Sequence, residues 1–139
     1  MNIREVYDRA EQLIGDGRYE KNVALAGAIT LELLNLLRPG LDAEQTAAAD
    51  FAKGFWSGHG SESDRVALIK SIGKRNDEYT EKFGPRSPKA SLNRLVFASL
   101  TNTTGLEPLL GEFLIGLAED AGLSPDEIAA AFFRHLPST

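Results

Sequence analysis

The sequence has no cysteine, only two histidines and a single tryptophan. Without cysteine the chain forms no disulfide bond, no thiolate nucleophile and no cysteine-ligated zinc or iron–sulfur site. Long apolar runs are also missing, because the longest, 23–37, is interrupted by polar residues and is shorter than the roughly 20 residues that span a bilayer. Residues 1–10 carry four charged side chains and lack the apolar stretch of a signal peptide. We therefore expect a cytoplasmic protein with no membrane partner.

Strand signals are equally scarce. No segment alternates apolar and polar residues with the β-branched enrichment of a strand. Apolar residues instead recur at helical spacing along the whole chain, and Gly and Pro separate the apolar runs. A chain of 139 residues fits one domain, 1–139. The sequence predicts an all-α, single-domain bundle of six or seven helices, over about 3–14, 18–37, 42–56, 63–83, 88–100, 108–121 and 124–136.

Three of the expected helices begin with capping boxes, the first of them formed by Asn2 and Glu5. Asp42 precedes Gln45, and Ser124 precedes Glu127, at the spacing at which each side chain satisfies the other residue's backbone N–H. Ser87 is expected to cap the helix that opens at Pro88, since proline suits the first helical position.

The helices around 18–37 and 108–121 are apolar on nearly every side, so we expect them to be central and buried. Glu32 and Asn35 are expected on the narrow strip of the first of these helices that reaches solvent. Two helices this apolar also leave room for a homodimer.

The helix over 63–83 should have one apolar side and one charged side. Its apolar side is expected to hold Ile69, Ile72, Tyr79 and Phe83.

Positive charge is concentrated in one stretch. Residues 65–94, the basic segment, hold eight Lys or Arg against three Asp or Glu, a net +5, while the rest of the chain carries −10. Such asymmetry bears on partners rather than on fold. Lys89 and Arg94 are five positions apart, so a patch built on them would need Lys82 or Arg86. A pI of about 5.0 speaks against a nucleic-acid partner.

The glycine-rich break at 57–61 exposes His59 close to Glu62 and Asp64. One histidine is too few for the three or more protein ligands of a usual metal site. Ser57 and Ser61 lie too near His59 in sequence for a serine–base–acid arrangement. We interpret the break as a structural loop and expect no catalytic residue, no metal and no cofactor.

Residues 117–133 have the spacing of a DNA-reading helix-turn-helix at Ala118, Gly122 and Ile128. Recognition helices, however, carry base-reading basic or amide side chains near their start, where this segment holds Asp126 and Glu127. Those carboxylates repel phosphates, so we interpret the segment as a tight corner between two helices.

Helical patterning without a catalytic constellation, together with segregated charge, predicts a small protein that acts by protein–protein interaction, as an adaptor, a regulator or an antidote-type inhibitor. One alternative is an RNA- or anion-binding module that uses the basic segment 65–94. A less favoured alternative is a cryptic enzyme around His59. The candidate binding residues are Trp56, His59, Lys74, Arg75, Arg86, Lys89 and Arg94.

Overall fold

A computed structural model describes residues 4–5, 8, 19–101 and 110–135. Within these ranges the chain forms six α-helices and one 3₁₀ helix, η1, and no strand. They are α2 (Tyr19–Leu36), η1 (Arg38–Gly40), α3 (Ala43–Trp56), α4 (Glu62–Phe83), α5 (Pro88–Thr101), α6 (Leu110–Asp120) and α7 (Pro125–His135). The predicted all-α fold is confirmed. The helix expected over 3–14 lies, apart from residues 4, 5 and 8, outside the described residues.

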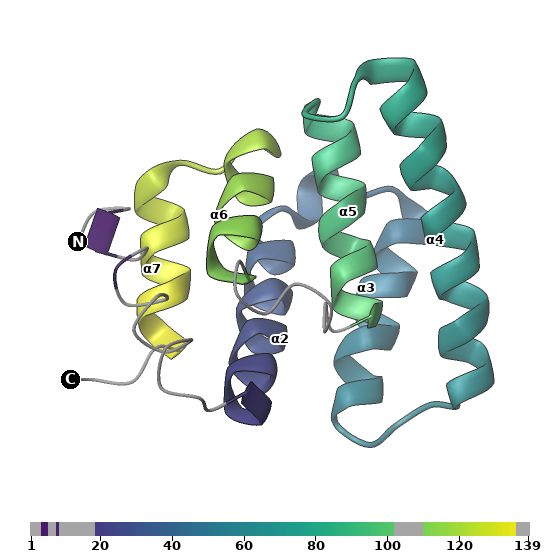
Figure 1. The fold of residues 1–139 in the computed structure, drawn as a ribbon. Helices are drawn as coiled ribbons and strands as arrows, with labels where there is room; N and C mark the ends of the chain where they lie inside the picture. Colours follow the sequence, from purple (N-terminus) through teal and green to yellow (C-terminus); the bar gives the residue numbers. More distant parts are fainter. Residues whose placement is uncertain (1–3, 6–7, 9–18, 102–109, 136–139) are drawn as a thin grey trace.

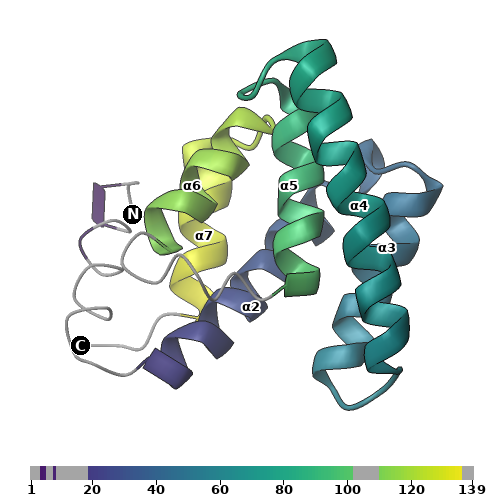
Figure 2. The same cartoon turned by 45° about the vertical axis from the view of Figure 1, so that its right-hand side comes forward.

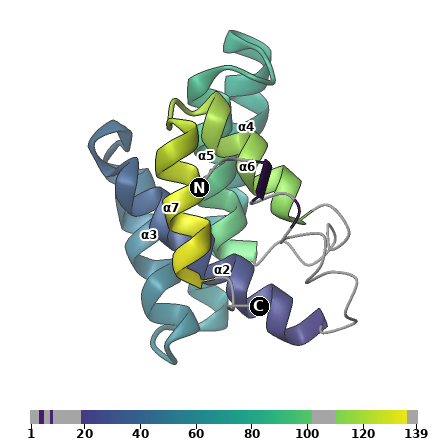
Figure 3. The same ribbon diagram turned by 90° about the vertical axis from the view of Figure 1, so that its left-hand side faces the viewer.

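The helices form two groups that meet at α5. In Figure 1, α2, α6 and α7 stand on one side, and α3, α4 and α5 on the other. The helix α5 packs against α2, α3, α4 and α6, and Figure 2 shows it between α6 and α4. Figure 3, seen from the side of α7, shows α7 lying over α2, against which it packs. The fold is therefore a bundle organised around α5.

Where their burial is described, at 27–36 and 114–120, the two apolar helices both contribute core residues, although Leu36 at the end of α2 is 37% exposed. On α2, Ile29, Leu33 and Leu34 are buried, and on α6 Leu114 and Ile115 are buried. The sequence did not single out α5, whose buried side chains include Ala90, Ser91, Asn93, Leu95, Val96, Ala98, Ser99 and Leu100. Alanine and serine are small enough to let neighbouring helices approach closely, which explains how α5 contacts four of them.

The predicted capping boxes at Asp42 and Ser124 are confirmed, while Asn2, the cap predicted for the first helix, lies outside the described residues. The Asp42 carboxylate accepts a hydrogen bond from Gln45 N at 2.8 Å, and Asp42 N donates to Gln45 Oε1 at 3.1 Å. Ser124 and Glu127 exchange the equivalent bonds at 3.0 and 3.2 Å. The helix α4 starts one residue before the predicted 63, because Ser61 Oγ accepts from the backbone N–H of its third helical residue.

The segment 117–133 is a helix corner, as interpreted from the sequence. Gly122 joins α6 to α7 with a φ of +108°, a conformation that suits glycine. Leu123 N donates to Ala118 O at 3.0 Å, and Ala118, Leu123 and Ile128 are all buried in the corner. Across the described ranges, no helix combines the length and the apolar character needed to cross a bilayer.

Candidate functional site

The structure separates the seven candidate binding residues instead of gathering them into one site. Trp56 and His59 lie at the end of α4 that faces the α3–α4 loop, and Arg86 and Lys89 lie at the other end, at the α4–α5 turn. The two ends are 22 residues of α4 apart, about 33 Å at 1.5 Å per residue. Lys74 is exposed midway between them.

Trp56 and Arg65 close the C-terminal end of α5. Trp56 Nε1 donates to Ser99 O at 2.7 Å, and Arg65 Nη1 donates to Leu100 O at 2.8 Å. These carbonyls belong to the last turn of α5, which lacks helical donors. The Arg65 guanidinium also lies 5.8 Å from the Trp56 ring centroid and 5.4 Å from that of Phe55. Trp56 is therefore engaged structurally, although 44% of it is exposed.

The loop around His59 shows no assembled site. His59 is exposed, and its backbone N–H donates to Gly54 O at 2.8 Å. Glu62 is bound by Arg65, whose Nε lies 2.9 Å from Glu62 Oε2. No group of three or more His, Asp or Glu side chains that could hold a metal ion occurs among the residues the structure describes.

Arg75 and Arg94 tie helices together. Arg75, only 17% exposed, binds the Asp42 carboxylate through both terminal nitrogens and lies 3.7 Å from a Glu44 oxygen. Its hydrogen bonds hold the pKa of Asp42 below the usual range. Arg94 Nη2 donates to Thr80 Oγ1 at 3.5 Å. Arg75 thereby links α4 to the start of α3, while Arg94 links α5 to α4.

At the opposite end, four side chains form what we call the basic tip: Lys82, Phe83, Arg86 and Lys89. The Lys82 and Lys89 ammonium groups lie 5.2 and 4.8 Å from the centroid of the Phe83 ring. Lys82 joins Lys89 at the Phe83 ring, whereas Arg94 binds Thr80, about one turn before Phe83. Phe83 was expected on the same side as Ile72, which is fully buried, yet 40% of Phe83 is exposed. The α4–α5 turn rises beyond the other helices in Figure 1, and besides the two lysines the Phe83 ring contacts Tyr79, whose ring centroid lies 5.9 Å away.

Arg86 has an acidic partner that the sequence did not indicate. Its Nε and Nη2 each lie 3.3 Å from an Asp120 oxygen on α6, and this carboxylate raises the pKa of Arg86. The Arg86 side chain nevertheless stays 85% exposed. Because its Arg86 side is open to solvent, this ion pair is screened, and Arg86 can exchange partners.

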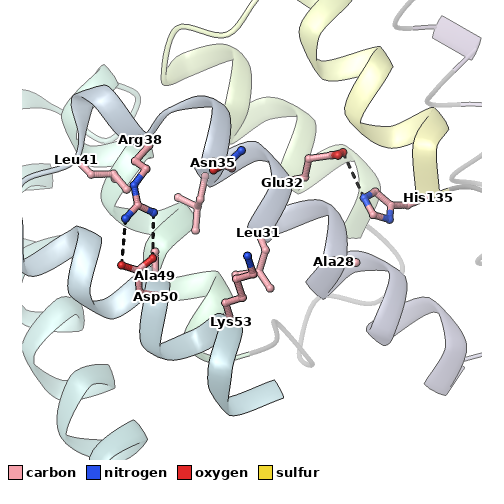
Figure 4. A pocket seen from close by; sticks show the side chains of 11 residues that line it. Ala28, Leu31, Glu32, Asn35, Arg38, Leu41, Ala49, Asp50, Lys53 and His135 are labelled. Carbon is pink, nitrogen blue, oxygen red and sulfur yellow. Dashed lines mark hydrogen bonds and ion pairs between the residues drawn. The ribbon is translucent and has the colours of Figure 1, made fainter. Parts of the chain in front are cut away.

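A hollow of about 430 Å³, the seam pocket, opens between α2, η1, α3 and α7 (Figure 4). Leu31, Leu34 and Leu41 provide much of its apolar lining. Its polar residues are Glu32, Asn35, Arg38, Asp50, Lys53 and His135. Arg38 donates to both oxygens of Asp50 at 3.0 and 3.1 Å. Sequence reasoning did not identify this pocket, because its lining comes from four separate elements.

Glu32 departs from its expected place on a solvent strip, whereas Asn35 is exposed as expected. The Glu32 side chain is only 22% exposed and lies 3.3 Å from both Arg134 Nε and His135 Nε2. The end of α7 supplies both partners, which are about a hundred residues away in sequence. A local pattern could not have revealed that pairing.

Comparison with known proteins adds no assignment: no family model matches the chain, and no curated protein or solved structure matches it.

Proposed function

We propose that this protein works by binding, and that its basic tip docks an acidic surface of another protein. The observation that carries the proposal is Phe83, an exposed aromatic ring flanked by the ammonium groups of Lys82 and Lys89. Neither lysine has an ion pair in the described part of the chain, so both charges are available to a partner.

The composition of the tip suits a protein interface. Aromatic and arginine side chains dominate the binding energy of such interfaces, usually near the centre of the contact. The lysines around Phe83 would steer an acidic partner and restrict its orientation. Arg86, whose side chain is 85% exposed, can add a further contact by exchanging the half-buried Asp120 carboxylate for one on the partner.

The same geometry favours a protein over RNA. Single-stranded nucleic acids stack their bases on open aromatic faces. The Lys82 and Lys89 ammonium groups already lie against the Phe83 ring, where a stacked base would have to lie. The negative remainder of the chain would also repel an extended phosphate backbone.

Site-specific photocrosslinking in cells of the source organism tests the proposal. The photoreactive residue p-benzoylphenylalanine is placed at position 83, and at position 66 as the matched control. Val66 is also 40% exposed on α4 but lies far from the tip. We expect position 83, and not position 66, to give one discrete protein adduct whose crosslinked peptide is rich in Asp and Glu.

Charge reversal then identifies the source of the binding energy. Lys82→Glu/Lys89→Glu should abolish the adduct and weaken binding of the purified partner by about tenfold or more. Lys70→Glu/Lys74→Glu changes the net charge equally at two exposed positions on α4 and should leave both unchanged. Equal adducts from positions 66 and 83, a nuclease-sensitive adduct, an adduct between two copies of this chain, or no adduct would each overturn the proposal.

A further inference from the structure

The seam pocket has the size and lining of a small-molecule site and is separate from the basic tip. Its volume of about 430 Å³ lies within the range of about 300–1,000 Å³ usual for ligand pockets, which pair apolar walls with a few polar groups. Leucines from α2 and the segment after η1 supply the apolar wall, and charged groups from α2, α3 and α7 lie around it.

Lys53 supplies an unmatched positive charge. In Figure 4 its side chain rises from α3 towards Leu31, between the Arg38–Asp50 pair and the Glu32–His135 pair. Asp50 already receives both hydrogen bonds of Arg38, which are the main cause of its lowered pKa, and Lys53 adds only a weaker attraction. Within the described ranges, the Lys53 ammonium has no ion pair.

Glu32 supplies unused hydrogen-bonding capacity at the other side. Its Oε2 and His135 Nε2 lie 3.3 Å apart, close enough for an ion pair, but they are not aligned for a hydrogen bond. Both atoms are buried, and neither has a hydrogen-bond partner among the residues that the structure describes. A buried carboxylate oxygen left in this state is costly, and native proteins usually satisfy it with protein, water or ligand.

From these features we infer that the seam pocket binds a small aliphatic molecule carrying both a carboxylate and an amine. The carboxylate pairs with the Lys53 ammonium, and the amine pairs with the carboxylate of Glu32, whose side chain is 22% exposed. The hydrocarbon between them lies on Leu31, Leu34 and Leu41. No bond is made or broken, so the proposal concerns recognition alone.

Amide NMR titration of the full chain tests this inference with three amino acids of increasing chain length: γ-aminobutyrate, ε-aminocaproate and ω-aminocaprylate. We expect one chain length to bind best, with shifts concentrated in residues 28–41, 49–53 and 135. Hexanoate lacks the amine and hexylamine lacks the carboxylate, so each should bind about tenfold more weakly than the best amino acid.

Two substitutions locate the charged contacts. Lys53→Ala should weaken binding of the best amino acid by about tenfold and change the binding of hexylamine little. The control Lys70→Ala on α4 should change neither affinity. Glu32→Gln keeps the shape of the side chain. It should weaken the binding of the amino acid and of hexylamine but not the binding of hexanoate. Thermal unfolding of each variant verifies that the fold is kept.

Several results would overturn the inference. They are the absence of shifts with all the probes at millimolar concentration, shifts centred on the basic tip, hexanoate or hexylamine binding as tightly as the amino acids, or Lys53→Ala binding like the wild type. None of these results bears on crosslinking at position 83, so this site and the proposed function can fail separately.

Discussion

Gln45 on α3 donates a hydrogen bond from its side-chain amide to the side-chain oxygen of Asn93 on α5, at 3.0 Å across 48 residues of sequence. Asn93 is fully buried. Its own amide nitrogen donates to Ile72 O at 3.0 Å and to Asn76 Oδ1 at 2.6 Å, both on α4. One buried asparagine thus connects three helices.

Removing that connection should destabilise the fold. Asn93→Ala leaves the buried Gln45 amide and the partly buried Asn76 oxygen without their partner, so we expect the free energy of unfolding to fall by about 3 kcal/mol. Urea denaturation measures this. Asn35→Ala removes the same side chain from an exposed position on α2 and should cost less than about 0.5 kcal/mol. Similar losses in the two variants would show that the buried bonds carry little stability.

Asp42 should make stability depend on pH in the acid range. Hydrogen bonds from Arg75 lower its pKa in the folded state. The stabilisation is therefore complete above the unfolded pKa of about 3.9 and is lost as the pH falls through the lower folded value. Asp42→Asn keeps a good N-cap but cannot titrate, so its free energy of unfolding should fall less steeply than that of the wild type below about pH 4.

Denaturant unfolding at a series of pH values tests the Asp42 prediction, with Asp77→Asn as the control. Asp77 is exposed on α4 and has no ion pair in the part of the chain that the structure describes. The control should follow the wild type. An Asp42→Asn profile that also follows the wild type would contradict the prediction.

Trp56 and Phe83 are exposed to similar extents, 44% and 40%, but should differ in their effect on stability. Trp56→Phe removes the indole N–H that binds Ser99 O and should lower the free energy of unfolding by about 1 kcal/mol. Phe83→Leu breaks no hydrogen bond and should cost less than about 0.5 kcal/mol. Thermal unfolding followed by circular dichroism compares them, and a larger loss from Phe83→Leu would reverse the assignment of a structural role to Trp56.

The α3–α4 loop offers a comparison of two glycines with nearly the same backbone. Gly58 and Gly60 have φ of +95° and +97°, so alanine at either position adds strain of about 1–2 kcal/mol. A Cβ at Gly60 would also lie 3.0 Å from the Phe51 ring, while one at Gly58 meets nothing within 4 Å. Gly60→Ala should therefore be the more destabilising of the two in urea denaturation. Equal losses would mean that Phe51 moves aside without cost.

Local features of the fold were predictable from the sequence, and long-range pairings were not. The caps at Asp42 and Ser124 were found because both partners of each box lie within four residues. The central place of α5 was missed because Ser91 and Asn93 make the helix look partly polar. Both side chains are in fact buried, and Asn93 is hydrogen-bonded by neighbouring helices.

The candidate binding residues show the same division. The sequence indicated that Lys89 needed Lys82 or Arg86 nearby, and the turn after α4 brings these residues together. It did not reveal that Arg75 is bound by Asp42, 33 residues away. Nor did it reveal that Arg86 faces Asp120, 34 residues away. Charge counted along the chain therefore overstated how much of the basic segment is free.

The seam pocket lies between the two groups of helices that meet at α5. Its walls come from α2 and α7 of one group and α3 of the other. A molecule bound there touches both groups at once, so its affinity is thermodynamically linked to their relative orientation. By the same linkage, any event that rotates one group against the other changes how tightly that molecule is held.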